Sequence, residues 1–79
     1  MAGKNPWDQR RLRLQKMLRA ARENAGLSQV QLAKKLRADQ SFVSRYERGE
    51  RRLDLVELLE ICRACNVHLP QFVREFYEG

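Results

Sequence analysis

The stretch from Ser28 to Gly49 constrains the fold of this chain most, because it holds two short helical patterns separated by a break of three residues. Both patterns place their inward side chains at the spacing of one helix face: Val30, Leu32, Ala33 and Leu36 before the break, and Val43, Tyr46 and Glu47 after it. The first segment is too short and the second too polar to be stable alone. Two helices joined by so tight a turn cross steeply, which predicts a helix-turn-helix.

Capping residues set the boundaries of this pair. Ser28 and Asp39 are good N-cap residues, so we expect one helix to begin just after each of them. The first helix of the pair should end near Leu36, and the second should run from Gln40 until Gly49 closes it. The helix-turn-helix is therefore predicted at about residues 28–49.

Three more helices are predicted around this pair, and no segment of the chain alternates with the two-residue period of a strand. Their expected boundaries are Asn5 with Pro6 and Gly26 for the first helix, Asp54 and Asn66 for the fourth, and Leu69 with Pro70 for the start of the fifth. The prediction is a single all-α domain of five helices over residues 1–79, with residues 1–5 as a flexible leader.

Apolar side chains predict how the flanking helices pack. The first helix is strongly basic apart from one apolar stripe, formed by Trp7, Leu14, Met17, Leu18, Ala21 and Ala25. The fourth helix is apolar on more than one face, so we expect it at the centre of the domain. The fifth helix carries four large apolar residues, and either all of them belong to the core or the excess forms a dimer surface with Phe72, Phe76 and Tyr77 as its candidates.

The charge of the chain suits a polyanionic partner. Its 16 Lys and Arg residues against 10 Asp and Glu give a formal net charge of +6. A basic protein that binds no nucleic acid has the same composition, so charge alone leaves both possibilities open. No apolar run approaches the roughly 18 residues of a membrane span, and the N-terminal residues do not form a secretory signal. We therefore expect a cytoplasmic, nucleoid-associated protein.

The second helix of the pair exposes a face suited to DNA. If this helix spans about residues 40–48, one exposed side carries five polar residues: Gln40, Ser41, Ser44, Arg45 and Arg48. They offer amide, hydroxyl and guanidinium groups and no carboxylate, and these are the groups that read base edges in the major groove. A merely solvated helix face more often includes Asp and Glu. The pattern therefore favours contact with double-stranded DNA.

The same region resembles the helix-turn-helix of lambda-repressor, Cro and XRE-type regulators. The resemblance rests on Leu27-Ser28-Gln29, Leu32-Ala33 and Leu36, followed by Val43-Ser44-Arg45-Tyr46-Glu47-Arg48-Gly49. It extends over about Leu14 to Phe76, which is most of the chain. It implies a sequence-specific transcriptional regulator with a five-helix DNA-binding domain, whose third helix enters the major groove and which binds a pseudo-palindromic operator as a homodimer.

The resemblance also implies roles for individual residues. Base edges are assigned to Gln40, Ser41, Ser44 and Arg45, and phosphates to Gln29, Arg48 and Arg52. Arg22 of the first helix is assigned to a structural ion pair with Glu47. Arg37 stands where a glycine is common, so the turn either adopts a left-handed backbone at a cost of roughly 1 kcal/mol or is built differently. Phe42, where a small or polar residue is common, either packs beneath the helix or meets a thymine methyl group, and Leu53 replaces a frequent proline.

Other functions lack the residues they need. Cys62, Cys65 and His68 are spaced like a redox or metal motif, but three ligands do not complete a structural zinc site, and the two cysteines fit an apolar core. A bridging zinc or a redox switch in a dimer is the remaining alternative. One histidine and scattered glycines predict no enzyme, cofactor, metal or small-molecule ligand. The alternative function is a protein-interaction or antitoxin-type adaptor that docks a partner on Phe72, Phe76 and Tyr77.

Overall fold

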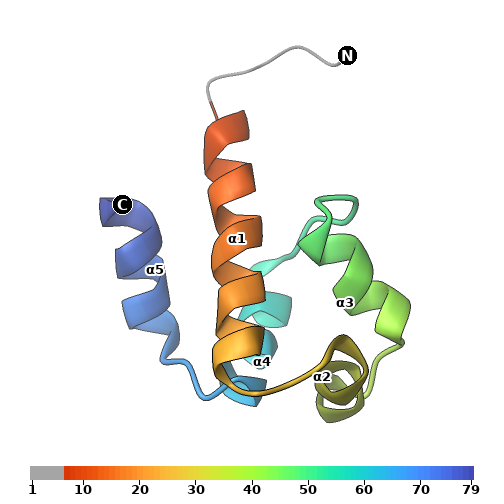
Figure 1. The fold of residues 1–79 in the computed structure, drawn as a ribbon. Coiled ribbons are helices and arrows are strands. Elements are labelled where there is room, and N and C mark those ends of the chain that lie inside the picture. Colours follow the sequence, from red (N-terminus) through yellow and green to blue (C-terminus); the bar gives the residue numbers. More distant parts are fainter. Residues whose placement is uncertain (1–6) are drawn as a thin grey trace.

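The structure, a computed structural model, describes residues 7–79, and within that range it contains five α-helices and no strands. The helices are α1 (Asp8–Asn24), α2 (Gln29–Leu36), α3 (Gln40–Glu47), α4 (Leu55–Ala64) and α5 (Leu69–Glu78). Figure 1 shows α1 through the middle of the molecule, with α5 on one side of it and α2 and α3 on the other. The predicted all-α fold with a helix-turn-helix at the second and third helices is confirmed. Within residues 7–79, no helix has the length and apolar character needed to span a bilayer.

Reciprocal hydrogen bonds fix the starts of α2 and α4. The Ser28 hydroxyl accepts a hydrogen bond from the backbone N–H of Gln31 (3.0 Å), and the Gln31 side chain accepts one from the backbone N–H of Ser28 (2.8 Å). Asp54 and Glu57 form the same arrangement at the start of α4, at 2.8 and 2.9 Å. Each pair satisfies two N–H groups that a helix start leaves without partners. Asp39 occupies the predicted N-cap position of α3, although its side chain makes no cap hydrogen bond.

Residues with positive φ stand just beyond the ends of the first four helices. Gly26 (φ 74°) and Gly49 (φ 78°) follow α1 and α3, and Asn66 (φ 59°) follows α4, all as predicted. These residue types tolerate the left-handed conformation. Arg37 ends α2 at φ 56° and ψ 42°, so the left-handed turn is the alternative that this chain adopts. An arginine in that conformation costs roughly 1–2 kcal/mol, which the surrounding packing offsets.

The first helix begins later than predicted. Trp7 flanks the helix and Asp8 is its first helical residue. The Trp7 side chain is 48% exposed, so it is not part of the buried stripe. The predicted cap at Asn5, the placement of Pro6 in the first turn and the flexible leader 1–5 all fall outside the described residues.

Side chains from all five helices, together with Cys65 just after α4, form one core. The buried apolar residues are Leu18, Leu32, Ala33, Val43, Tyr46, Ile61, Cys62, Cys65 and Phe72. Leu32, Val43 and Tyr46 are each no more than 2% exposed, so the facing sides of α2 and α3 are fully covered. This burial supplies the stability that two helices of eight residues do not have alone.

Several predicted core positions lie at the surface instead. Val30 is 46% exposed because the buried side of α2 carries Leu32 and Ala33. One turn before them, Gln29 rather than Val30 lies on that side of the helix. Leu55 and Val56 of α4 are each 68% exposed, because α4 is buried through the side that carries Ile61 and Cys62. Ala25, at the end of α1, is also exposed. Only part of α4 is therefore at the centre of the domain.

The large apolar residues of α5 are divided between the core and the surface. Phe72 is 4% exposed and belongs to the core, so its assignment to a dimer surface is wrong. Phe76 is half-buried, whereas Val73 and Tyr77 are 44% and 86% exposed. Val73 and Tyr77 are four residues apart, so they share one outer side of α5.

Candidate nucleic-acid interface

The outward side of α3 carries the side chains that the sequence assigned to DNA bases. Val43 and Tyr46 point into the core at 0% and 2% exposure, which turns the opposite side of the helix to solvent. Gln40, Ser41 and Arg45 are exposed there, and Ser44 beside them is half-buried. Figure 1 shows α3 at the edge of the molecule, on the side of α1 away from α5. The whole outward side of α3 is therefore accessible to a large partner.

An ion pair anchors the end of α3 to α1. Arg22 donates to both carboxylate oxygens of Glu47, with Nε 2.7 Å from Oε2 and Nη2 3.1 Å from Oε1. The two side chains are only 10% and 5% exposed. The hydrogen bonds from Arg22 to Glu47 raise the pKa of Arg22, although burial acts in the opposite direction. The third nitrogen of Arg22, Nη1, donates to the carbonyl of Leu27 at 2.9 Å, so the guanidinium also holds the chain that enters α2.

Gln29 extends this network to the start of α3. Its side-chain Nε2 donates to Oε1 of Glu47 at 3.1 Å. Its Oε1 accepts from Nε2 of Gln40 at 3.5 Å, which is a long and weak contact. The first residue of α2 thus contacts the first and last residues of α3, and this limits how α3 can tilt against α2.

Arg48, assigned to phosphates, already has an intramolecular carboxylate partner. Its Nε and Nη2 donate to the two oxygens of Glu50 at 3.1 and 2.9 Å, and Nη1 donates to the hydroxyl of Ser44. Arg48 lowers the pKa of Glu50 through these hydrogen bonds. The pair is exposed, so its contribution to stability is small. Sequence reasoning missed Glu50, because it lies beyond the end of α3, where helical spacing does not apply.

A second arginine organises the loop after α3. Arg51 donates to both carboxylate oxygens of Glu57 at 3.1 and 2.7 Å and to the carbonyl of Arg52. Its guanidinium carbon lies 4.7 Å from the centre of the Phe42 ring. Phe42 in turn packs edge-on against Tyr46, with ring centres 5.4 Å apart. Phe42 therefore packs along the flank of α3, and Arg51 was the organising residue that the sequence did not single out.

Two arginines of this surface have no carboxylate partner. Within residues 7–79, neither Arg45 on α3 nor Arg52 in the following loop makes an ion pair. Both side chains are exposed. Arg45 lies on the helix and Arg52 on the loop, so the surface offers cations at two separate places.

The two cysteines lie away from this surface. Cys62 and Cys65 are free thiols, buried at 1% and 4% exposure. Burial raises the pKa of each thiol, which keeps it protonated and unreactive near neutral pH. Within the described residues, no group of three or more His, Cys, Asp or Glu side chains is arranged to hold a metal ion.

A sequence profile of the helix-turn-helix family matches residues 18–72, which is most of the chain. The chain belongs to this family. A search of curated proteins finds no match. A solved structure of an XRE-family like protein from Pseudomonas syringae pv. tomato str. DC3000 is 35% identical, over 90% of this chain and 87% of that chain, with a TM-score of 0.86. Family and structural likeness together make this protein a DNA-binding transcriptional regulator of the XRE type rather than an enzyme.

Two other solved structures are similar. A mutant of the restriction-modification controller protein C.Esp1396I is 25% identical, over 87% of each chain, with a TM-score of 0.78. The clp gene regulator ClgR from C. glutamicum is 23% identical, over 99% of this chain and 96% of that chain, also with a TM-score of 0.78. At that identity, ClgR supports the likeness of fold alone.

Proposed function

We propose that this helix-turn-helix protein binds an operator in double-stranded DNA as a dimer, with α3 in the major groove. The observation that carries the proposal is the outward side of α3, which presents amide, hydroxyl and guanidinium groups from a helix whose end is held at Glu47 by Arg22 and Gln29. A rigidly held helix keeps its side chains at the positions that base recognition needs.

Four side chains of α3 read base edges in this proposal. Arg45 makes no ion pair within residues 7–79 and is long enough to donate two hydrogen bonds to a guanine. Gln40 pairs with an adenine, and its long contact to Gln29 is easily exchanged for that pairing. Ser41 and Ser44 contact bases of either type, although Ser44 must first release the guanidinium of Arg48.

Phosphate contacts flank the bases on both sides. Arg52 is available at once, whereas Arg48 reaches a phosphate only when it leaves Glu50. Gln29 lies at the start of α2, where backbone N–H groups also favour an anion, and its amide already bridges α2 and α3. These contacts set the register of α3 on the DNA without reading its sequence.

Dimerisation uses the outer side of α5 in this proposal. Val73 and Tyr77 are exposed there, and Phe76 lies beside them at partial burial. A twofold pair places two copies of α3 about one helical turn apart, roughly 34 Å, on successive major grooves. The operator is then an inverted repeat with that spacing between half-site centres.

Selection of bound sequences from a pool of random DNA duplexes tests the proposal. We expect an inverted repeat to be enriched, and the selected site to bind at least about a thousandfold more tightly than unrelated duplex at the same salt concentration. Retention of every sequence with one affinity, in the range of about 10⁻⁴ to 10⁻⁶ M, would contradict operator recognition.

A further inference from the structure

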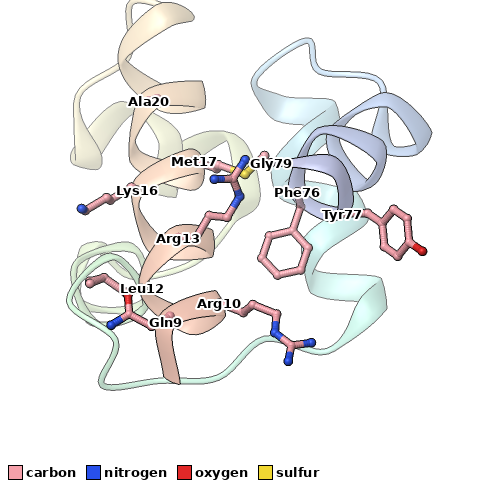
Figure 2. Close-up of a pocket in the computed structure, with 10 residues that line it drawn as sticks. All are labelled: Gln9, Arg10, Leu12, Arg13, Lys16, Met17, Ala20, Phe76, Tyr77 and Gly79. Carbon is pink, nitrogen blue, oxygen red and sulfur yellow. The ribbon is translucent and has the colours of Figure 1, made fainter. Parts of the chain in front are cut away.

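A groove with a volume of about 810 Å³ runs between α1 and α5, on the side of α1 that faces away from α2 and α3. Its wall on α1 is one helix face, and its lining includes three apolar side chains, Leu12, Met17 and Phe76, and three cations, Arg10, Arg13 and Lys16. In Figure 2, Arg10 and Arg13 extend from α1 toward α5, and the Phe76 ring projects from α5 into the space between the helices.

The cations of this groove lack carboxylate partners. Arg10 and Lys16 make no ion pair within residues 7–79, and no Asp or Glu lines the groove. Arg13 donates from Nη2 to the carbonyl of Glu75 at 3.1 Å, while its Nε is buried without a hydrogen-bond partner. On the other surfaces of the molecule, most exposed arginines of the helices pair with a neighbouring carboxylate, as Arg19 does with Glu23. The groove therefore carries positive charge that no Asp or Glu side chain of its lining neutralises.

The length and the apolar lining of the groove suit a helical segment of another protein. Leu12 is 44% exposed, and Met17 and Phe76 are partly buried. The wall on α1 runs from Gln9 to Ala20, which corresponds to about 16 Å, or three helical turns. An apolar floor with cations at its edges matches an amphipathic helix whose apolar face is flanked by carboxylates. We propose that the groove between α1 and α5 binds an acidic amphipathic helix of a partner protein.

A second copy of this chain fits the groove less well. A twofold contact through the groove places Arg10 and Lys16 of one copy near the same residues of the other, and their like charges repel. The proposed dimer surface meets the groove only at its edge on α5, where Phe76 and Tyr77 belong to both, and Figure 2 shows the Tyr77 side chain directed away from α1. The groove also lies across α1 from α3, so one chain can hold DNA and the acidic helix at the same time.

A synthetic helical peptide of about 14 residues tests the inference, with leucine and phenylalanine along one face and glutamate on both flanks. Binding to the full chain is measured by fluorescence anisotropy of the labelled peptide. We expect saturable binding at one peptide per chain, and a loss of at least about tenfold in affinity for the double variant Arg10→Glu with Lys16→Glu. The matched control Arg19→Glu with Arg63→Glu changes the net charge equally, at exposed positions outside the groove, and should change the affinity by no more than about twofold.

Further measurements distinguish binding of the peptide in the groove from nonspecific electrostatic attraction between the peptide and the protein. Leu12→Ser should weaken the glutamate peptide several-fold, and a peptide with lysine in place of each glutamate should not bind. Equal losses for the two double variants, or equal binding of the lysine peptide, would overturn the inference. Displacement of the peptide by short single-stranded DNA, with the same dependence on Arg10 and Lys16, would assign the groove to nucleic acid instead. None of these results depends on whether an operator exists.

Discussion

Glu47 is the single side chain on which the placement of α3 depends. Its side chain is 5% exposed, and its carboxylate accepts two hydrogen bonds from Arg22 and one from Gln29. A carboxylate so deep in a protein is tolerated only when its oxygens have partners. Because those partners come from α1 and from the start of α2, the ion pair and the Gln29 hydrogen bond together fix the positions of three helices relative to each other.

Removal of this carboxylate is expected to be costly. Glu47→Ala leaves the Arg22 guanidinium buried without its partner, and we expect the free energy of unfolding to fall on the order of 3 kcal/mol. Urea denaturation followed by circular dichroism measures this change. The double variant Arg22→Met with Glu47→Leu removes both charges and should recover most of the loss. A double variant as unstable as the single one would show that shape, rather than an unpaired charge, determines the loss.

Arg45 and Arg52 should respond differently to truncation, because one faces bases and the other phosphates in the proposed complex. Arg45→Ala is expected to cost about 1–3 kcal/mol on the selected operator and to relax the preference at one base pair. Arg52→Ala should weaken all duplexes alike and reduce the slope of log affinity against log salt by about one. Both are measured by titration of operator and unrelated duplexes over a range of salt concentrations. Equal losses on every sequence for Arg45→Ala would argue against base reading.

Glu50 is expected to limit affinity for DNA, because it holds Arg48 and adds a negative charge near the phosphates. Glu50→Gln keeps the shape of the side chain and frees the arginine. We expect several-fold tighter binding to operator and unrelated duplex alike, together with a steeper dependence on salt. Glu60→Gln removes the same charge from the exposed side of α4 and serves as the control. If both variants tighten binding equally, net charge rather than release of Arg48 is the cause.

At the level of elements, α2 and α3 form one unit whose turn carries a strained residue. Each helix has eight residues, about two turns, which is too short to be stable in isolation. The reciprocal cap at Ser28 supports the start of α2, and the buried side chains Leu32 and Val43 join the two helices. Arg37 ends α2 in a left-handed conformation that arginine disfavours. The packing between α2 and α3 therefore has to stabilise the turn that connects them.

Replacement of Arg37 by glycine should relieve that strain. Glycine adopts the left-handed conformation freely but loses more freedom on folding, so we expect Arg37→Gly to stabilise the protein by up to about 1 kcal/mol. Lys35→Gly, at an exposed position inside α2, should destabilise it by about 1 kcal/mol. Thermal and urea unfolding of both variants measure the difference. A loss of stability for Arg37→Gly would mean that the arginine side chain contributes more than its backbone costs.

Most helix ends were predictable from the sequence, whereas burial was predictable only in part. Ser28, Asp54 and Gly26 act within one turn of their own backbone, so local chemistry determines where each helix starts or stops. The burial of Val30 and Leu55 depends instead on how whole helices cross, which no local pattern contains. The helical period of 3.6 residues correctly predicted which side of α3 faces solvent. The carboxylate partners of Arg48 and Arg51 were not predictable, because they depend on the path of the loop after α3, which the sequence did not indicate.

The proposed DNA-contact surface and the proposed dimer surface lie on opposite sides of α1. The side chains proposed to contact DNA lie on α3 and the loop after it, whereas α5 lies across α1 with Val73 and Tyr77 on its outer side. This separation lets two chains associate through α5 without covering either copy of α3. In the proposed complex each copy reads only a few base pairs, and specificity increases when two copies bind one site, because the second contact becomes effectively intramolecular.

The outer side of α5 should therefore control both assembly and operator binding. Tyr77→Lys places a charge in the proposed dimer contact, and we expect the dimer to weaken by at least about tenfold, measured by sedimentation equilibrium. On DNA, the variant should still bind a single half-site like the unaltered chain but lose its preference for the full inverted repeat. Leu55→Lys makes the same change at another exposed apolar position and should leave both properties unaltered. If Leu55→Lys dissociates the dimer and Tyr77→Lys does not, the two chains meet through α4, because only there would the new charge lie within the contact.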